Sequence, residues 1–107
     1  MNNKKEIGSF YEKKAIEYLI KEGYSILNYN FRLSYKEIDI ICEKNHITTI
    51  VEVKYRKKYF PSITPQQRNN ILSVMEKICS NKFCQVDFIY FNKKNELYHL
   101  KNILHLD

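Results

Sequence analysis

The chain has 107 residues, of which 44% are apolar and 28% charged, and its 18 Lys and Arg against 12 Asp and Glu give a formal charge of +6. With only two Gly and two Pro, it cannot be a disordered tail, a collagen-like chain or a linker, and we expect a single domain over residues 1–107. No run approaches the ~20 apolar residues of a membrane span, and the polar start lacks the apolar core of a signal peptide, so we expect a cytoplasmic protein with no membrane partner.

The expected elements begin with a helix from about Lys5 to Glu22, because apolar residues recur there at steps of three and four. Gly23 is expected to end this helix. Three runs rich in β-branched and aromatic residues follow and predict strands over 24–31, 37–42 and 48–55. The polar turn 44–46 joins the last two strands as a hairpin.

A second helix is expected from Pro65 to about Ser80, with Thr64 as N-cap and Gln67 completing a capping box. Its predicted inner face consists of Ile71, Val74, Met75 and Ile78. Two more strand-like runs, 85–91 and 96–100, close the chain. The order α-β-β-β-α-β-β predicts an α/β fold in which helices flank a mixed sheet.

The three cysteines, Cys42, Cys79 and Cys84, are expected to be free thiols. Their number is odd and only the last two are close in sequence, so their spacing indicates neither a disulfide framework nor a zinc site. A structural zinc ion would need four Cys or His ligands at short spacings, whereas the three histidines are scattered.

The positive charge is concentrated between residues 53 and 75, a segment that contains no acid. Its cationic residues are Lys54, Arg56, Lys57, Lys58 and Arg68. Tyr55, Tyr59 and Phe60 interleave with them, a composition typical of surfaces that hold phosphates and stack on bases. A solvated basic loop, or the Lys-rich codon usage of an A+T-rich genome, explains the charge about equally well, so charge alone does not decide for nucleic acid.

The second expected strand carries acids among apolar residues. Period-two alternation places Glu37 and Asp39 on one face and Ile38 and Ile40 on the other, which we expect to be a core face. A strand with one solvent-exposed face often carries charged residues on that face. Each acid, considered by itself, can therefore be an ordinary exposed residue.

The third expected strand repeats this pattern, with Glu52 and Lys54 on one face and Val51 and Val53 on the core face. Together with Asp39, these charges fit phosphodiester hydrolysis, in which Mg²⁺ polarises phosphoryl oxygens and lowers the pKa of a bound water. Mg²⁺ needs only one or two carboxylates, because it keeps several waters. Lys54 could orient the attacking water or stabilise charge developing on the phosphate.

Asp39 followed by Glu52-Val53-Lys54, with Glu12 in the first helix, resembles the motif of the PD-(D/E)xK nuclease superfamily. Within it, the chain most resembles the YraN family of small bacterial proteins, which are related to archaeal Holliday junction resolvases. The segments that carry this resemblance are 8–24, 30–32, 37–41, 51–56 and 86–87. The resemblance implies a restriction-endonuclease-like fold with an αβββαβ core, and a metal-dependent endonuclease acting on DNA, including branched or structured DNA.

The resemblance also implies roles for individual residues. Asp39 and Glu52 would hold Mg²⁺ or Mn²⁺ with the backbone carbonyl of Val53, and Lys54 would complete the motif. Glu12 matches the helix-one acid of the resolvases, although an ordinary amphipathic-helix charge also explains it. The expected catalytic residues are therefore Glu12, Asp39, Glu52 and Lys54.

Around this set, Glu37 is expected to support Asp39, although a solvated strand acid explains it as well. Gln67 matches a position near the phosphate in related nucleases, and its capping role explains it equally. Asp87 matches a family position without a clear role. The expected nucleic-acid-binding residues are Arg56, Lys57, Lys58, Gln67 and Arg68.

Three functions stay open. The first is the endonuclease, and the second is a non-catalytic nucleic-acid-binding module on the same fold, with idle carboxylates. The third, a structural partner in a larger assembly, gains support only if both binding and cleavage are absent. Charge does not separate DNA from RNA. From the chain's size and its resemblance to the resolvases, we expect a homodimer, because a chain this short would need a second copy to grip a junction symmetrically.

Overall fold

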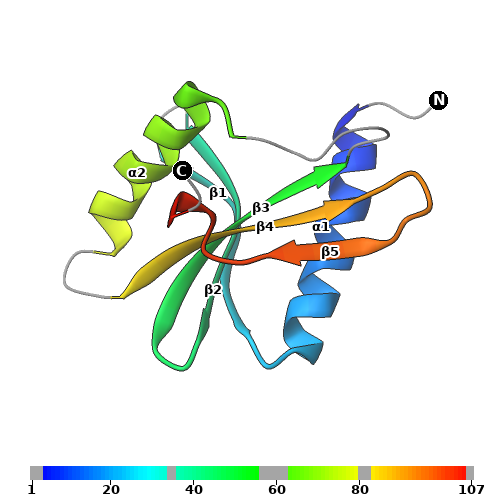
Figure 1. Ribbon diagram of the computed structural model, residues 1–107, viewed down its shortest axis with the longest axis horizontal. Coiled ribbons are helices and arrows are strands. Elements are labelled where there is room, and N and C mark those ends of the chain that lie inside the picture. The colour runs from blue at the N-terminus through cyan, green and yellow to red at the C-terminus, as the bar shows by residue number, and fades with distance from the viewer. Residues whose placement is uncertain (1–3, 34–35, 56–62, 80–82, 106–107) are drawn as a thin grey trace.

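The computed structural model describes residues 4–33, 36–55, 63–79 and 83–105 (Figure 1). The elements follow the expected order, with ends that differ from the predicted ones by a few residues. They are α1 (Lys4–Lys21), β1 (Ser25–Leu33), β2 (Lys36–Lys44), β3 (Ile47–Tyr55), α2 (Pro65–Ile78), β4 (Cys84–Phe91), β5 (Leu97–Leu100) and η1 (Ile103–His105). The short 3-10 helix η1 was not predicted.

The strands form one mixed sheet in the order β1-β2-β3-β4-β5. Neighbouring strands are antiparallel except for β3 and β4, which are parallel. A parallel pair needs a crossover connection, and α2 lies in the segment that provides it. Figure 1 shows α1 and α2 on opposite sides of the sheet, which confirms the predicted mixed sheet flanked by helices.

Each helix covers its own half of the core. On one face, Ala15 and Leu19 of α1 pack with strand residues that include Ile40 and Val51. On the other face, Ile71 and Val74 of α2 pack with a second set of strand residues, Ile38, Ile41, Ile50 and Val86. The predicted core positions are confirmed, with Val53 only partly buried against the α1 side.

The predicted alternation along β2 is wrong at one point. Ile38 packs on the α2 side and Ile40 on the α1 side, although period two places them on the same face. The pairing of β2 with β3 runs from Lys44↔Ile47 to Ile40↔Val51, and before Ile40 the strand keeps only β1 as its partner. The reversal therefore coincides with the point where β2 separates from β3.

Local signals at the ends of elements are confirmed. The Thr64 backbone N–H donates to Gln67 Oε1 at 3.0 Å, and the Gln67 backbone N–H donates to Thr64 Oγ1 at 3.1 Å, which is the predicted capping box. Gly23, at φ +93°, ends α1 with the backbone bonds of a Schellman motif. Asn45 and His46 both have positive φ, as a two-residue type I′ hairpin turn requires.

The prediction of free thiols is wrong for two of the three cysteines. Cys79 and Cys84 form a disulfide with a Cα–Cα distance of 6.1 Å, while Cys42 is a free, buried thiol. Cys79 follows the end of α2 and Cys84 begins β4, so the end of this helix and the start of this strand lie close together. A spacing of five residues does not reveal this, because it depends on where the helix ends. No helix within the described ranges is both long and apolar enough to cross a membrane.

Candidate functional site

The predicted acids meet where β2 and β3 separate, a region that we call the acid fork and define by Glu12, Asp39 and Glu52. Beyond the last backbone pair of the two strands, Asp39 Oδ2 accepts a hydrogen bond from the Val53 backbone N–H at 2.8 Å. A carboxylate thus takes the place of the missing strand partner. Val53 stays in register with Ile89 of β4, so β3 remains anchored to the sheet on its other edge.

Glu52 is the most strongly perturbed acid of the fork. Its Oε1 atom is buried and has no hydrogen-bond partner among the described residues. Burial above all raises the pKa of Glu52 to about 8, the negative charge of Asp39 adds to the rise, and the charge of Lys54 opposes it. A hydrogen bond from the Asp39 backbone favours the anion, but a carboxylate with one buried, unpaired oxygen remains costly when charged, so a proton or a nearby cation stabilises this group.

Glu12 reaches the fork from α1, which packs over β2 and β3. Burial raises the pKa of Glu12 to about 7, and the charge of Asp39 and a hydrogen bond with its side chain contribute further. Burial also raises the pKa of Asp39, although its hydrogen bonds with Val53 and Glu12 and the charge of Lys54 counteract part of that rise. All three acids are therefore easier to protonate than exposed carboxyls, as expected where acids lie close together and are partly removed from solvent.

The donor set of the fork fits a hard cation that keeps its own waters. Within the described part of the chain, no three His, Cys, Asp or Glu side chains form a group able to hold a metal ion by themselves. Mg²⁺ accepts a smaller set of one or two carboxylates, and Asp39 and the partnerless oxygen of Glu52 provide it. The N–H and C=O of one strand residue project toward the same edge. Because the Val53 N–H points at Asp39, its carbonyl faces the fork as well.

Lys54 and Glu37 surround the fork with opposite charges. Lys54 is partly buried, and its ammonium lowers the pKa of both Asp39 and Glu52, so it acts electrostatically on both acids. Glu37 is exposed and pairs with Arg32 at 3.6 Å. Its charge raises the pKa of Glu12 and Asp39, which puts Glu37 at the rim of the fork. Its support of Asp39 stays a prediction.

The predicted nucleic-acid-binding residues fall into two groups. Arg56, Lys57 and Lys58 lie outside the described residues. Gln67 and Arg68 belong to the first turn of α2, where both are partly buried. Gln67 fills the capping box described above, and the Arg68 backbone N–H donates to the Thr64 carbonyl. Their roles in binding stay predictions.

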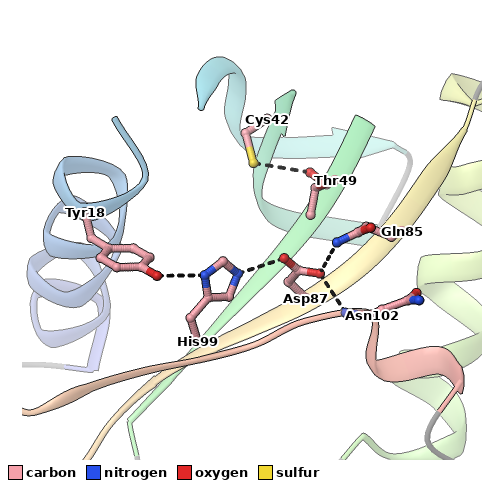
Figure 2. Close-up of polar contacts among 7 residues, drawn as sticks. All are labelled: Tyr18, Cys42, Thr49, Gln85, Asp87, His99 and Asn102. Atoms are coloured by element: carbon pink, nitrogen blue, oxygen red, sulfur yellow. Dashed lines mark hydrogen bonds and ion pairs between the residues drawn. The ribbon is translucent and has the colours of Figure 1, made fainter. Parts of the chain in front are cut away.

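Sequence reasoning missed a second polar cluster, which involves Asp87 (Figure 2). Asp87 is fully buried, and its Oδ1 accepts hydrogen bonds from Gln85 Nε2 and from the Asn102 backbone N–H, both at 2.9 Å. Its Oδ2 lies 2.7 Å from His99 Nε2, and His99 Nδ1 lies 2.9 Å from the Tyr18 hydroxyl. We call this chain of contacts the Asp87 network.

The Asp87 network joins elements that are far apart in the sequence. It connects Tyr18 of α1 to β4, to β5 and to the segment that precedes η1. Because α1 also carries Glu12, the network helps to fix the helix that delivers one acid to the fork. The position of Asp87 directly before the apolar run 88–91 indicated a buried carboxylate. No pattern in the sequence near Asp87 identified His99 as its partner.

The fold is shared with the solved structure of an archaeal resolvase. The Holliday junction resolvase of the archaeal hyperthermophile Archaeoglobus fulgidus superposes with a TM-score of 0.67 at 13% sequence identity, over 87% of this chain and 75% of that chain. This match confirms the predicted restriction-endonuclease-like fold.

The chain belongs to a protein family described as "Uncharacterised protein family UPF0102", whose model matches residues 11–91. This is the YraN family that the sequence motifs indicated. Relatives named UPF0102 protein include one from Caldicellulosiruptor saccharolyticus, 38% identical over 89% of this chain and 91% of its own length. Others are one from Clostridium botulinum, 37% identical over 92% and 91%, and one from Sulfurihydrogenibium, 35% identical over 98% and 99%.

Proposed function

We propose that this protein is a metal-dependent endonuclease that hydrolyses phosphodiester bonds in DNA, including branched or structured DNA. The observation that carries the proposal is the acid fork, where Asp39 bridges two separating strands and a buried oxygen of Glu52 has no partner among the described residues. The fold shared with a Holliday junction resolvase supports the choice of DNA as substrate.

In this proposal Asp39, Glu52 and the carbonyl of Val53 hold Mg²⁺ or Mn²⁺. When bound, the ion supplies Lewis acidity toward the phosphate and lowers the pKa of a water molecule. Lys54 stabilises negative charge that develops on the phosphate, because its ammonium already acts on both acids. Glu12 sits beside Asp39 with a raised pKa, so it can hold or release a proton near neutral pH.

The DNA would approach over the acid-free basic segment that follows β3. Arg56, Lys57, Lys58, Gln67 and Arg68 are the proposed phosphate contacts, and binding should weaken as salt rises. We propose that two copies of the chain act together on a branched substrate and that the protein works in the cytoplasm, where bacterial DNA is located.

The proposal is tested by two measurements on the same preparations. Calorimetric titration with Mg²⁺ or Mn²⁺ should show binding to the wild type and its loss in Glu52→Gln and Asp39→Asn. A cleavage panel of linear, nicked, flapped and four-way DNA should show metal-dependent products that both variants lose. Glu17→Gln, at an exposed position of α1, is the matched control and should behave as the wild type.

Two results would count against the nuclease. Absence of metal binding together with absence of cleavage by the wild type would refute it. Salt-sensitive DNA binding that Lys57→Ala weakens, with no cleavage under either metal, would instead favour the non-catalytic binding module.

A further inference from the structure

A cavity of about 390 Å³ opens between α1 and the edge strand β1, directly beside the acid fork. It is lined by Ser9, Glu12, Lys13, Ile16, Tyr29 and Asn30. Glu12 belongs both to the cavity lining and to the acid fork, because its side chain also contacts Asp39. The volume lies within the ~300–1,000 Å³ of typical small-molecule sites, so the cavity has room for one nucleotide unit but not for a duplex.

Two neighbouring residues of β1 line this cavity, and the backbone there departs from a regular strand. In a regular strand, successive side chains point to opposite faces, so Tyr29 and Asn30 could not both line one cavity. Asn30 has φ +51°, the left-handed conformation that Asn adopts more readily than most residues. The Tyr29 backbone N–H donates to Asn28 Oδ1 at 2.8 Å, which satisfies a donor on this sheet edge.

Tyr29 leaves a large aromatic surface uncovered at the cavity. The residue is 60% exposed, whereas the other aromatic residue of β1, Phe31, packs against the core on the α2 side. A flat aromatic face at a cavity wall is the usual platform for stacking a nucleobase.

The remaining lining residues match the other parts of a nucleotide. Ile16 offers an apolar surface, while the Ser9 hydroxyl and the Asn30 carboxamide can exchange hydrogen bonds with the edge of a base. Lys13 is exposed and adds a cation for the attached phosphate. A base inside a duplex is stacked and paired, so only an unpaired or extruded base can enter such a cavity.

We propose that this cavity takes one unpaired nucleobase of the DNA, stacked on Tyr29, while its phosphate lies at the acid fork. The inference rests on the proposed function and specifies its substrate more closely. The preferred substrate would carry an unpaired nucleotide next to the bond that is cleaved, as at a bulge, a flap or a branch point.

The test compares two DNA probes in buffer with EDTA, so that binding is measured apart from cleavage. One probe is a duplex with a single unpaired adenine nucleotide, and the other carries an abasic residue at the same position. Both have the same charge and nearly the same shape, and they differ by one base. Stacking of that base should make the wild type bind the adenine probe about 5- to 150-fold more tightly than the abasic probe.

Three variants test whether the aromatic ring of Tyr29 causes the preference for the adenine probe. Tyr29→Ala and Tyr29→Leu should bind both probes almost equally, whereas Tyr29→Phe, which keeps the aromatic face, should retain the preference. Leu27→Ala is the matched control, because Leu27 is an equally exposed residue of β1, at 53%, that does not line the cavity. Circular dichroism should show that all four remain folded, since neither position is buried.

The inference is overturned if the wild type binds both probes equally, if Tyr29→Ala keeps the discrimination, or if neither probe binds. Cleavage of the same two probes with Mg²⁺ separates this outcome from failure of the proposed function. Discrimination without cleavage would contradict the nuclease alone, and cleavage without discrimination would contradict the cavity alone.

Discussion

Buried acids occur in two regions of this molecule with opposite surroundings. In the Asp87 network, both oxygens of a fully buried carboxylate face donors that come from β4, β5 and the segment before η1. In the acid fork, Asp39 interacts with both Glu12 and Glu52, and one Glu52 oxygen lacks any partner within the described ranges. Glu52 of β3 and Asp87 of β4 lie on neighbouring strands of the same sheet, so their place in the sheet does not distinguish them.

This difference in hydrogen-bond donors shows how an acid with a structural role can be distinguished from an acid with a functional role. A buried carboxylate that has all its hydrogen bonds stabilises the fold through those bonds, and removing it leaves its donors unsatisfied. A charged carboxylate with a buried oxygen that has no donor destabilises the fold until a proton or a cation is bound. The four predictions that follow test this contrast, from the largest expected effect to the smallest.

Asp87→Asn should destabilise the protein most. The amide presents a donor where the carboxylate accepted hydrogen bonds, so one of the groups from Gln85, His99 or Asn102 loses its acceptor inside the core. Leaving a buried donor without an acceptor costs about 1–3 kcal/mol of the free energy of unfolding, and more when the donor is charged. Urea denaturation followed by circular dichroism measures this cost. Glu17→Gln, at an exposed site, should stay within about 0.5 kcal/mol of the wild type.

The second prediction concerns the pH dependence of stability without metal. The pKa of Glu52 is raised from 4.5 in a free carboxyl to about 8 in the folded protein, so the folded state binds more protons than the unfolded state between these values. The free energy of unfolding should therefore fall as pH rises from about 4.5 to about 8, by up to ~1.4 kcal/mol per pH unit for this group.

Thermal unfolding in EDTA over this pH range measures the fall. Mg²⁺ or Mn²⁺ should raise the melting temperature more at pH 8 than at pH 5, because the fork is more negative at pH 8. A stability that is flat over this range, or one that increases with pH, would show that the acids of the fork are not perturbed by burial.

Glu52→Gln should change the free energy of unfolding in the opposite direction to Asp87→Asn. It removes a buried charge that faces Asp39 and keeps the side-chain volume, so the metal-free protein at pH 8 should gain about 0.5–2 kcal/mol of stability. The same variant should no longer be stabilised by Mg²⁺ in a thermal shift experiment. A loss of stability comparable to that of Asp87→Asn would mean that the two regions play the same structural role.

Much of the fold follows from local signals. Thr64, Pro65 and Gln67 define the start of α2 by capping chemistry alone, and Gly23 ends α1 because only a positive φ fits there. The alternation along β3 correctly predicts a buried Val51. By contrast, the reversal between Ile38 and Ile40 depends on where the pairing of β2 with β3 stops, which is a property of two strands and not of one.

The candidate site is less accessible to sequence reasoning. The residue types and their spacing placed acids on neighbouring strands, but the contact of Asp39 with the Val53 N–H spans the hairpin and needs the strands to separate. Cys79 and Cys84 pair because the end of α2 lies close to the start of β4, and this proximity cannot be read from their spacing. His99 meets Asp87 and Tyr18 only after β5 has paired with β4, so no local pattern reveals the network.

Tyr18→Phe gives the smallest effect and tests the link between the two regions. Loss of the hydroxyl removes one hydrogen bond to His99 and leaves the ring in place, so the free energy of unfolding should fall by about 0.5–1.5 kcal/mol. Because Tyr18 and Glu12 share α1, any loosening of the helix against the sheet should also weaken the affinity for Mg²⁺ slightly, by less than about fivefold. Tyr98→Phe, on the exposed side of β5, is the control and should change neither quantity. If Tyr18→Phe lowers stability but leaves metal affinity unchanged, the network holds the fold without positioning Glu12, and the two regions act independently.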